Sequence, residues 1–120
     1  MAWRVDTTPD GATVTAVFEG RLTEEDAVTS ACAFSDAIRE RPVDVVWDLR
    51  EMSGYDSKAR EAWQEAIWPS RRNIRSLTLI GAKPTVRVGG MMLAIFIGAP
   101  WKFVNAPQGE TPPEPDRSEA

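Results

Sequence analysis

A run of alternating residues at positions 43–49, followed closely by a helix-capping pair, constrains the fold more than any other part of the chain. Every second position in this run is apolar, and these positions are Val43, Val45, Trp47 and Leu49. A period of two is typical of a β-strand with one buried face. Residues 50–55 then predict a short loop, and Asp56 or Ser57 is suited to cap the helix that follows. A strand that leads into a helix in this way is the building unit of α/β folds.

Two strands joined by a tight turn are predicted at the start of the chain. Residues 3–7 have strand character, and residues 12–19 alternate between two faces. Pro9-Asp10-Gly11 lies between them and combines a fixed φ, a side chain that can bond to its own backbone, and a residue that tolerates positive φ. We therefore expect a β-hairpin.

A helix is predicted between this hairpin and the run at 43–49. Thr23 is a good N-cap, and the acidic residues 24–26 suit the positive end of a helix. The apolar pattern continues through Val28 and Cys32, and Pro42 stops the helix. The lone cysteine is thus expected to be a small core or boundary residue.

The second half of the chain predicts another helix and two more strands. The apolar residues of this helix fall on one stripe, which consists of Ala59, Ala62, Trp63, Ala66 and Ile67. Pro69 is expected to end or kink the helix. Residues 77–81 and 101–104 are short and mostly apolar, and both are expected to be strands.

Residues 86–97 are apolar on nearly every side, and their pattern allows two structures. One is a buried helix that packs closely through Gly89-Gly90 and ends at Gly98. The other is a hairpin that turns at the same glycine pair. The local pattern does not distinguish the helix from the hairpin.

The order of these elements is β-β-α-β-α-β-α-β, and it predicts an α/β fold with a mostly parallel sheet and helices packed on it. Residues 1–106 are expected to form one domain. Residues 107–120 are rich in proline and acidic residues and lack large apolar side chains, so we expect a disordered acidic tail.

The composition excludes several classes of function. The net charge is −4 and the pI is about 4.8, which argues against a nucleic-acid partner and against docking on an anionic membrane. The longest apolar run, residues 91–99, is too short for a membrane helix, so no stable membrane insertion is expected and a cytoplasmic location is predicted. The chain has no histidine and one cysteine, which leaves no expected metal site or cofactor.

Catalysis is not expected either. The polar residues around the predicted loop that an enzyme could use are Asp48, Ser53, Tyr55, Asp56, Ser57 and Lys58. Ser57 and Lys58 are neighbours at a helix start, so their side chains diverge. No glycine-rich phosphate-binding loop follows any predicted strand.

The order of elements, together with two short motifs, resembles the STAS domains, which include the anti-sigma-factor antagonists. Asp48-Leu49 is followed by Asp56-Ser57 at the spacing of the antagonists, and Phe18-Glu19-Gly20-Arg21-Leu22 resembles the end of the family's second strand. The resemblance covers roughly residues 3–105 and is closest to the bacterial branch grouped with the CRAL-TRIO-like lipid-binding fold. It implies a helix over residues 86–97.

The resemblance also implies that Ser57 is a phosphorylation switch, because the antagonists are phosphorylated at the matching serine. The alternative is that Ser57 or Asp56 simply caps the second helix. Lys58-Ala59-Arg60-Glu61 departs from the small residues of the family pattern, Ser-Gly-Leu-Gly. A phosphate at Ser57 would be favoured by the helix N-terminus.

Two binding functions follow, and both are non-catalytic. The first is a bacterial regulatory module that binds a protein, either a kinase or anti-sigma-like partner or a second copy of itself. Its predicted binding surface consists of Asp48, Met52, Ser53, Tyr55, Asp56, Lys58 and Arg60. The alternative is a carrier or sensor of a small apolar, lipid-like ligand. The predicted apolar ligand or homodimer surface consists of Trp63, Met91, Met92, Ile95 and Phe96, and the ligand function requires a closed or nearly closed cavity lined by the third helix.

Overall fold

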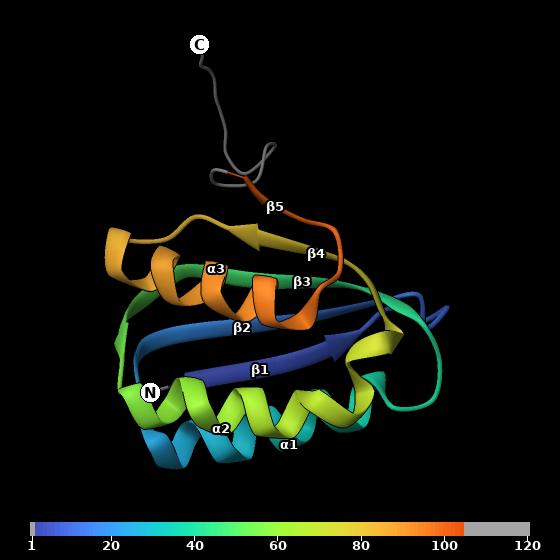
Figure 1. The fold of residues 1–120 in the computed structure, drawn as a ribbon, viewed down its shortest axis with the longest axis horizontal. Helices are drawn as coiled ribbons and strands as arrows, with labels where there is room; N and C mark the ends of the chain where they lie inside the picture. The colour runs from blue at the N-terminus through green and yellow to red at the C-terminus, as the bar shows by residue number, and fades with distance from the viewer. Residues whose placement is uncertain (1, 105–120) are drawn as a thin grey trace, which may run out of the picture.

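The computed structural model describes residues 2–104, and their order of elements is the one predicted (Figure 1). The elements are β1 (Ala2–Thr7), β2 (Thr13–Leu22), α1 (Glu24–Ile38), β3 (Val43–Tyr55), α2 (Ser57–Ile67), a 3₁₀ helix η1 (Trp68–Asn73), β4 (Ile74–Ile80), α3 (Pro84–Ile97) and β5 (Trp101–Val104). The predicted tail at 107–120 lies outside the described residues.

The five strands form one sheet in the order β1-β2-β3-β4-β5. The hairpin partners β1 and β2 are antiparallel, and every later pair is parallel. Because each helix connects two adjacent strands in the same direction across the sheet, right-handed crossovers place all three helices on one face. Figure 1 shows α1 and α2 along one half of this face and α3 along the other half. The predicted α/β class with a mostly parallel sheet is confirmed.

The core lies between the sheet and the pair α1 and α2, and its centre is aromatic. Trp63 of α2 is only 2% exposed, and its ring centroid lies 5.1 Å from that of Phe34 on α1 and 5.5 Å from that of Trp47 on β3. Phe18 on β2 completes the cluster at 5.6 Å from Trp63. The indole nitrogen of Trp63 donates a hydrogen bond to the buried Ser30 hydroxyl at 3.2 Å. This half of the molecule is therefore densely packed around its aromatic rings.

The prediction of a loop at residues 50–55 is wrong, because β3 continues through these residues to Tyr55. The strand β2 also runs further than expected and pairs with this extension, with Gly20 opposite Met52 and Leu22 opposite Tyr55. Two register shifts in β2 and β3 accommodate the extra length. The helix α2 therefore starts directly at the end of a long strand.

The inward face of α1 also differs from the prediction by about one residue. Thr23 is the N-cap as expected, with its hydroxyl accepting from the Asp26 amide at 3.3 Å. The buried positions, however, are Ala27, Ser30, Ala31, Phe34 and Ile38. Cys32 is exposed, and Val28 is 48% exposed. Phe34 is the larger apolar side chain, and its burial sets the rotation of the helix.

Residues 84–97 form a helix, as the family resemblance implied, and Gly98 ends it in the left-handed conformation with φ 83°. The helix is not buried on all sides as the apolar pattern suggested. Val88, Met92 and Ile95 are exposed, and Ile95 is 65% exposed. Among residues 2–104, no helix has both the length and the apolar character that a bilayer crossing requires.

Candidate functional site

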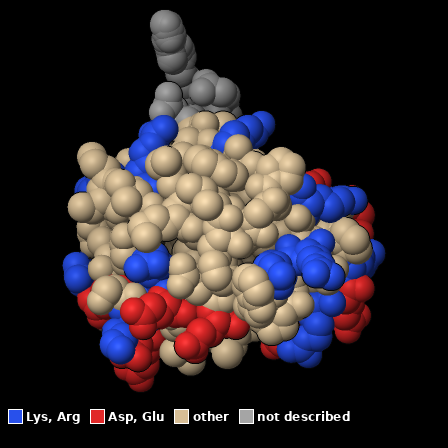
Figure 2. Space-filling model, in the orientation of Figure 1, with Lys and Arg blue, Asp and Glu red and all other residues tan. Residues whose placement is uncertain are grey.

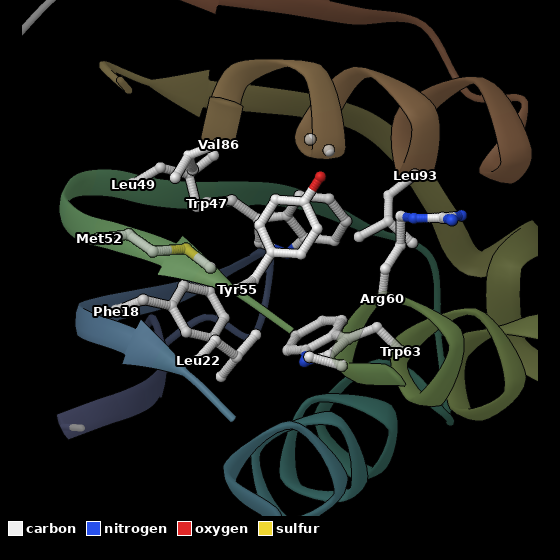
Figure 3. Close-up of a pocket in the computed structure, with 13 residues that line it drawn as sticks. Phe18, Leu22, Trp47, Leu49, Met52, Tyr55, Arg60, Trp63, Val86 and Leu93 are labelled. Atoms are coloured by element: carbon white, nitrogen blue, oxygen red, sulfur yellow. The ribbon is translucent and has the colours of Figure 1, made fainter. Parts of the chain in front are cut away.

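A pocket lies between α2, α3 and the end of β3, and we call it the α3 pocket (Figure 3). Its volume is about 50 Å³. It is lined by Phe18, Leu22, Trp47, Leu49, Met52, Tyr55, Ala59, Arg60, Trp63, Val86, Gly89, Gly90 and Leu93. The ligand-binding alternative required a closed or nearly closed cavity beside the third helix, whereas this pocket is small and partly open.

Two glycines of α3 let this helix approach the sheet and the end of β3. A Cβ atom on Gly89 would lie 2.5 Å from the Tyr55 hydroxyl oxygen, and one on Gly90 would lie 2.7 Å from Leu79 Cδ2. Both distances are shorter than real contacts of a Cβ atom. The glycine pair predicted from the sequence to allow close packing therefore does so, and it forms one wall of the pocket.

Three residues that carry polar groups, Trp47, Tyr55 and Arg60, line this otherwise apolar pocket. The buried indole nitrogen of Trp47 has no hydrogen-bond partner among residues 2–104. The Tyr55 hydroxyl points toward α3, and Arg60 rises from α2 beside Leu93 (Figure 3). Neither Tyr55 nor Arg60 makes a side-chain hydrogen bond or ion pair within the described part of the chain. All three groups can donate hydrogen bonds.

The start of α2 is held by an ion pair rather than by a side-chain cap. Asp56 occupies the N-cap position, but its carboxylate caps no amide and instead lies 2.9 Å from Arg21 at the end of β2. The Arg21 side chain fits beside Gly54, whose Cβ would lie 3.1 Å from it. Ser57 is the first helical residue and is exposed. The prediction that Asp56 or Ser57 caps the helix is thus confirmed for the position of Asp56 but not for its side chain.

Asp48 lies away from these residues, on the face of the sheet that no described helix covers. The sequence placed it at the carboxyl end of a strand, but β3 continues for seven residues beyond it, to Tyr55. Its carboxylate accepts hydrogen bonds from Arg50 Nε at 2.9 Å and Nη2 at 2.7 Å. These bonds, reinforced by the Arg50 amide and charge, hold the pKa of Asp48 below its ordinary value of 3.8.

The outward side of α3 is an exposed apolar surface. We call Val88, Met92 and Ile95 the α3 outer face, since they are exposed and follow one another at helical spacing. Trp68 from η1 is 48% exposed and packs against Phe96 of α3 at 5.1 Å. Figure 2 shows a broad uncharged area here, with charged side chains around its edges.

The structure brings together only part of each predicted surface. Tyr55 and Arg60 meet at the α3 pocket, while Asp56, Ser57 and Lys58 lie at the α2 start, where Lys58 is exposed and 3.9 Å from Glu61. The two other predicted binding residues differ in exposure, with Met52 buried in the pocket wall and Ser53 exposed.

The predicted apolar set divides in the same way. Trp63 is buried in the core and reaches only the inner wall of the pocket. Met92 and Ile95 belong to the α3 outer face, and Met91 and Phe96 are half-buried beside it. The pocket residues missed from the sequence come from four separate elements, and only the spacing of Val86, Gly89, Gly90 and Leu93 along one helix face could have indicated them.

Comparison with known proteins bears on the fold rather than on these residues. The sequence matches no protein-family model and no curated protein. In structure, the chain is similar to an uncharacterised protein of the DUF3478 family from Shewanella loihica, described as having a SpoIIAA-like fold. The TM-score is 0.65 at 17% identity, over 86% of this chain and 84% of that one.

The chain is also similar to the anti-sigma factor antagonist SpoIIAA in its unphosphorylated form. The TM-score is 0.61 at 19% identity, over 91% of this chain and 93% of that one. The chain therefore has the SpoIIAA-like fold, and the resemblance to STAS domains seen in the sequence is confirmed at the level of the fold.

Proposed function

We propose that the chain is a non-catalytic regulatory module of the STAS type, which acts in the bacterial cytoplasm by binding a protein partner. The observation that carries this proposal is the α3 outer face. An exposed apolar helix face is typical of a protein interaction site, because water contact with it is unfavourable until a partner covers it. The fold shared with an antagonist supports a regulatory role, although a fold by itself does not determine function.

The charge distribution around this face favours a protein surface as the partner. The only ionised residue within α3 is Arg87, which stacks over the Phe103 ring at 4.3 Å. Arg71 lies over the Trp68 ring at 3.4 Å. An apolar centre with arginines and aromatic rings at its rim has the composition of a protein–protein interface. The partner is a kinase or anti-sigma-like protein, or a second copy of this chain.

Phosphorylation at Ser57 is the proposed switch of this module. Ser57 is exposed at the first turn of an eleven-residue helix. The Asp56 side chain leaves the first helical amides uncapped, and Arg21 neutralises the Asp56 carboxylate at 2.9 Å. A phosphate at Ser57 would gain hydrogen bonds from these amides and attraction from Arg21 and Lys58. It would add up to two negative charges at the exposed start of α2.

The experiment is to purify the tagged full chain from the organism that encodes it and to map phosphates by peptide mass spectrometry. A phosphate at Ser57 is expected. In the same purifications, Ser57→Asp should change the amount of the bound partner about tenfold relative to Ser57→Ala. The matched control is Thr29→Asp, which adds the same charge at an exposed position of α1.

Equal amounts of bound partner with Ser57→Asp, Ser57→Ala and Thr29→Asp would contradict the proposed phosphorylation switch. Loss of the partner with Thr29→Asp alone would move the interface to α1 and contradict the proposal as a whole.

A further inference from the structure

The strand β5 forms one edge of the sheet, and its alternate backbone groups face outward (Figure 1). The carbonyls of Pro100 and Val104 accept hydrogen bonds from the β4 side, at 2.9 and 2.8 Å. Because a strand turns the backbone groups of successive residues to opposite sides, those of Trp101 and Phe103 point away from β4. These amides and carbonyls therefore have no partner strand among residues 2–104.

The two edges of the sheet differ in how well they are protected against an added strand. At the other edge, β1 carries the exposed Arg4–Asp6 ion pair at 2.6 Å, and charged side chains discourage pairing with another chain. The β5 edge instead presents Trp101, which is 37% exposed, and half-buried Phe103, whose ring lies 6.1 Å from that of Trp101. Both residues stand on the helix side of the sheet, opposite buried residues of β4. The β5 edge is therefore the open position for a further strand.

The C-terminal part of the described chain, which forms this edge, carries only positive charges. Residues 66–104 contain six lysines and arginines and no acidic residue, whereas residues 2–65 contain fourteen acidic and seven basic residues. Lys102 on β5 is exposed, and Arg87 of α3 lies over the Phe103 ring at 4.3 Å. Neither cation pairs with an acidic side chain in the described part of the chain. An acidic occupant is therefore favoured at this edge.

The charges also distinguish the possible sources of an added strand. Pairing β5 with β5 of a second copy would bring Lys102 and Arg87 close to their own counterparts, and like charges on neighbouring strands are unfavourable. The acidic residues that follow β5 in the sequence, within positions 107–120, are interspersed with four prolines. Proline lacks the amide that a sheet ladder needs, so this stretch is poorly suited to pair with the edge. A segment of another protein fits better.

We infer that the β5 edge binds an extended acidic segment of a partner protein, which adds to the sheet as a sixth strand. Side chains of an added strand alternate between the two faces as those of β5 do. Its apolar side chains lie on the helix side beside Trp101 and Phe103, and its acidic side chains lie on the opposite face beside Lys102. This inference depends neither on Ser57 nor on a partner at the α3 outer face.

The test is an NMR titration of the full chain with a short synthetic peptide in which valine and glutamate alternate. The amides of Trp101 and Phe103 are expected to shift and to exchange more slowly with solvent, with a dissociation constant on the order of 0.1–1 mM. Two matched peptides are the controls. One has lysine in place of glutamate, and the other has N-methylated amides, which cannot donate to the strand. Each should bind about tenfold more weakly.

Variants of β5 separate the backbone contacts from the side-chain contacts. Phe103→Pro removes an outward amide that the pairing of β5 with β4 does not use, whereas Phe103→Ala removes the ring and keeps the amide. The proline variant should bind the glutamate peptide about tenfold more weakly than the alanine variant. If Phe103→Pro does not fold, the N-methylated peptide tests the same hydrogen bonds.

A charge reversal tests the acidic character of the segment. Lys102→Glu should weaken binding of the glutamate peptide about tenfold and strengthen binding of the lysine peptide. The matched control is Lys83→Glu, which reverses an exposed charge of the same basic region outside β5 and should change the affinity less than about twofold.

Equal binding of the glutamate and lysine peptides would contradict the inference, and so would the absence of any shift up to about 5 mM peptide. Shifts of the Trp101 and Phe103 amides on dilution of the protein alone would assign the edge to a second copy. Shifts of these amides after neutralising the four acidic residues within 107–120 would assign it to the chain itself. Either assignment would overturn the proposed partner.

Discussion

The two halves of the helical layer, α1 with α2 and α3 alone, pack against the sheet with different kinds of side chains. Between α1, α2 and the sheet, large aromatic rings meet edge to face, and the one buried hydroxyl is bonded to Trp63. Between α3 and the sheet, a glycine pair replaces large side chains, a cavity remains, and the outer side of the helix is apolar and exposed. The first half has the features of a structural core, and the second has those of a binding site.

The difference shows why the hydrophobic content of a helix does not by itself indicate its burial. The helix α3 is the most apolar of the three, yet Val88, Met92 and Ile95 remain exposed. In α2, most of the residues outside the apolar stripe are polar, and the stripe is covered by α1 and the sheet. Apolar residues beyond those that the core needs are therefore available for partners.

The largest expected difference in stability is between the loss of Trp63, in the core under α1 and α2, and the loss of Trp68, beside α3. Trp63→Ala should lower the free energy of unfolding by about 3–5 kcal/mol, because it leaves a large cavity and removes the indole donor to the Ser30 hydroxyl. Trp68→Ala removes the same side chain at a 48% exposed site and should cost about 1 kcal/mol or less. Urea unfolding followed by circular dichroism measures both. Similar losses in the two variants would show that the α3 side is part of the core.

A smaller effect is expected from the glycine pair itself. Gly90→Ala puts a methyl group 2.7 Å from Leu79 Cδ2, and the cost of overpacking exceeds the gain in helix propensity by roughly 1 kcal/mol. The loss should shrink in a Leu79→Val background, which removes the clashing atom. Urea unfolding of the double-mutant cycle isolates this coupling. An additive cycle would contradict the close approach of α3 to the sheet.

The smallest effect concerns Asp48, on the face of the sheet that no described helix covers, and this effect is lost in acid. The pKa of Asp48 is lowered in the folded protein, so its contribution to stability is fully present above the ordinary value of 3.8 and is lost as the pH falls below it. The difference in urea midpoint between wild type and Asp48→Asn should therefore narrow between about pH 6 and pH 2. A difference that stays constant with pH would mean that Arg50 does not stabilise the ionised carboxylate.

The sequence predicted the elements well and their boundaries less well. The alternation at Val43, Val45, Trp47 and Leu49 identified the central strand, because side chains alternate between two faces only along an extended backbone. The extension of β3 to Tyr55 was missed, since it depends on pairing with β2 at a register that local patterns do not encode. The rotation of α1 was missed because Val28 and Phe34 compete for burial, and only packing decides between them.

The candidate site could be predicted only where its residues are neighbours in the sequence. The position of Ser57 after Asp56 at a helix start, and the close packing allowed by Gly89-Gly90, were both visible in the sequence. The α3 pocket was not, because its walls come from residues as distant as Leu22 and Leu93. Asp48 appeared to belong to the site only because the end of β3 was placed too early.

Site-specific photo-crosslinking in the living source organism tests whether the α3 side is the binding side. A photoreactive residue at Ile95, which is 65% exposed on α3, is compared with one at Val28, which is 48% exposed on α1. Both are exposed aliphatic residues within a helix, so they differ mainly in the side of the molecule that they report. The expected result is a discrete crosslinked protein, or a crosslinked dimer of this chain, from position 95 and none from position 28. Crosslinks from position 28 alone, or equal crosslinks from both positions, would contradict the assignment of binding to α3.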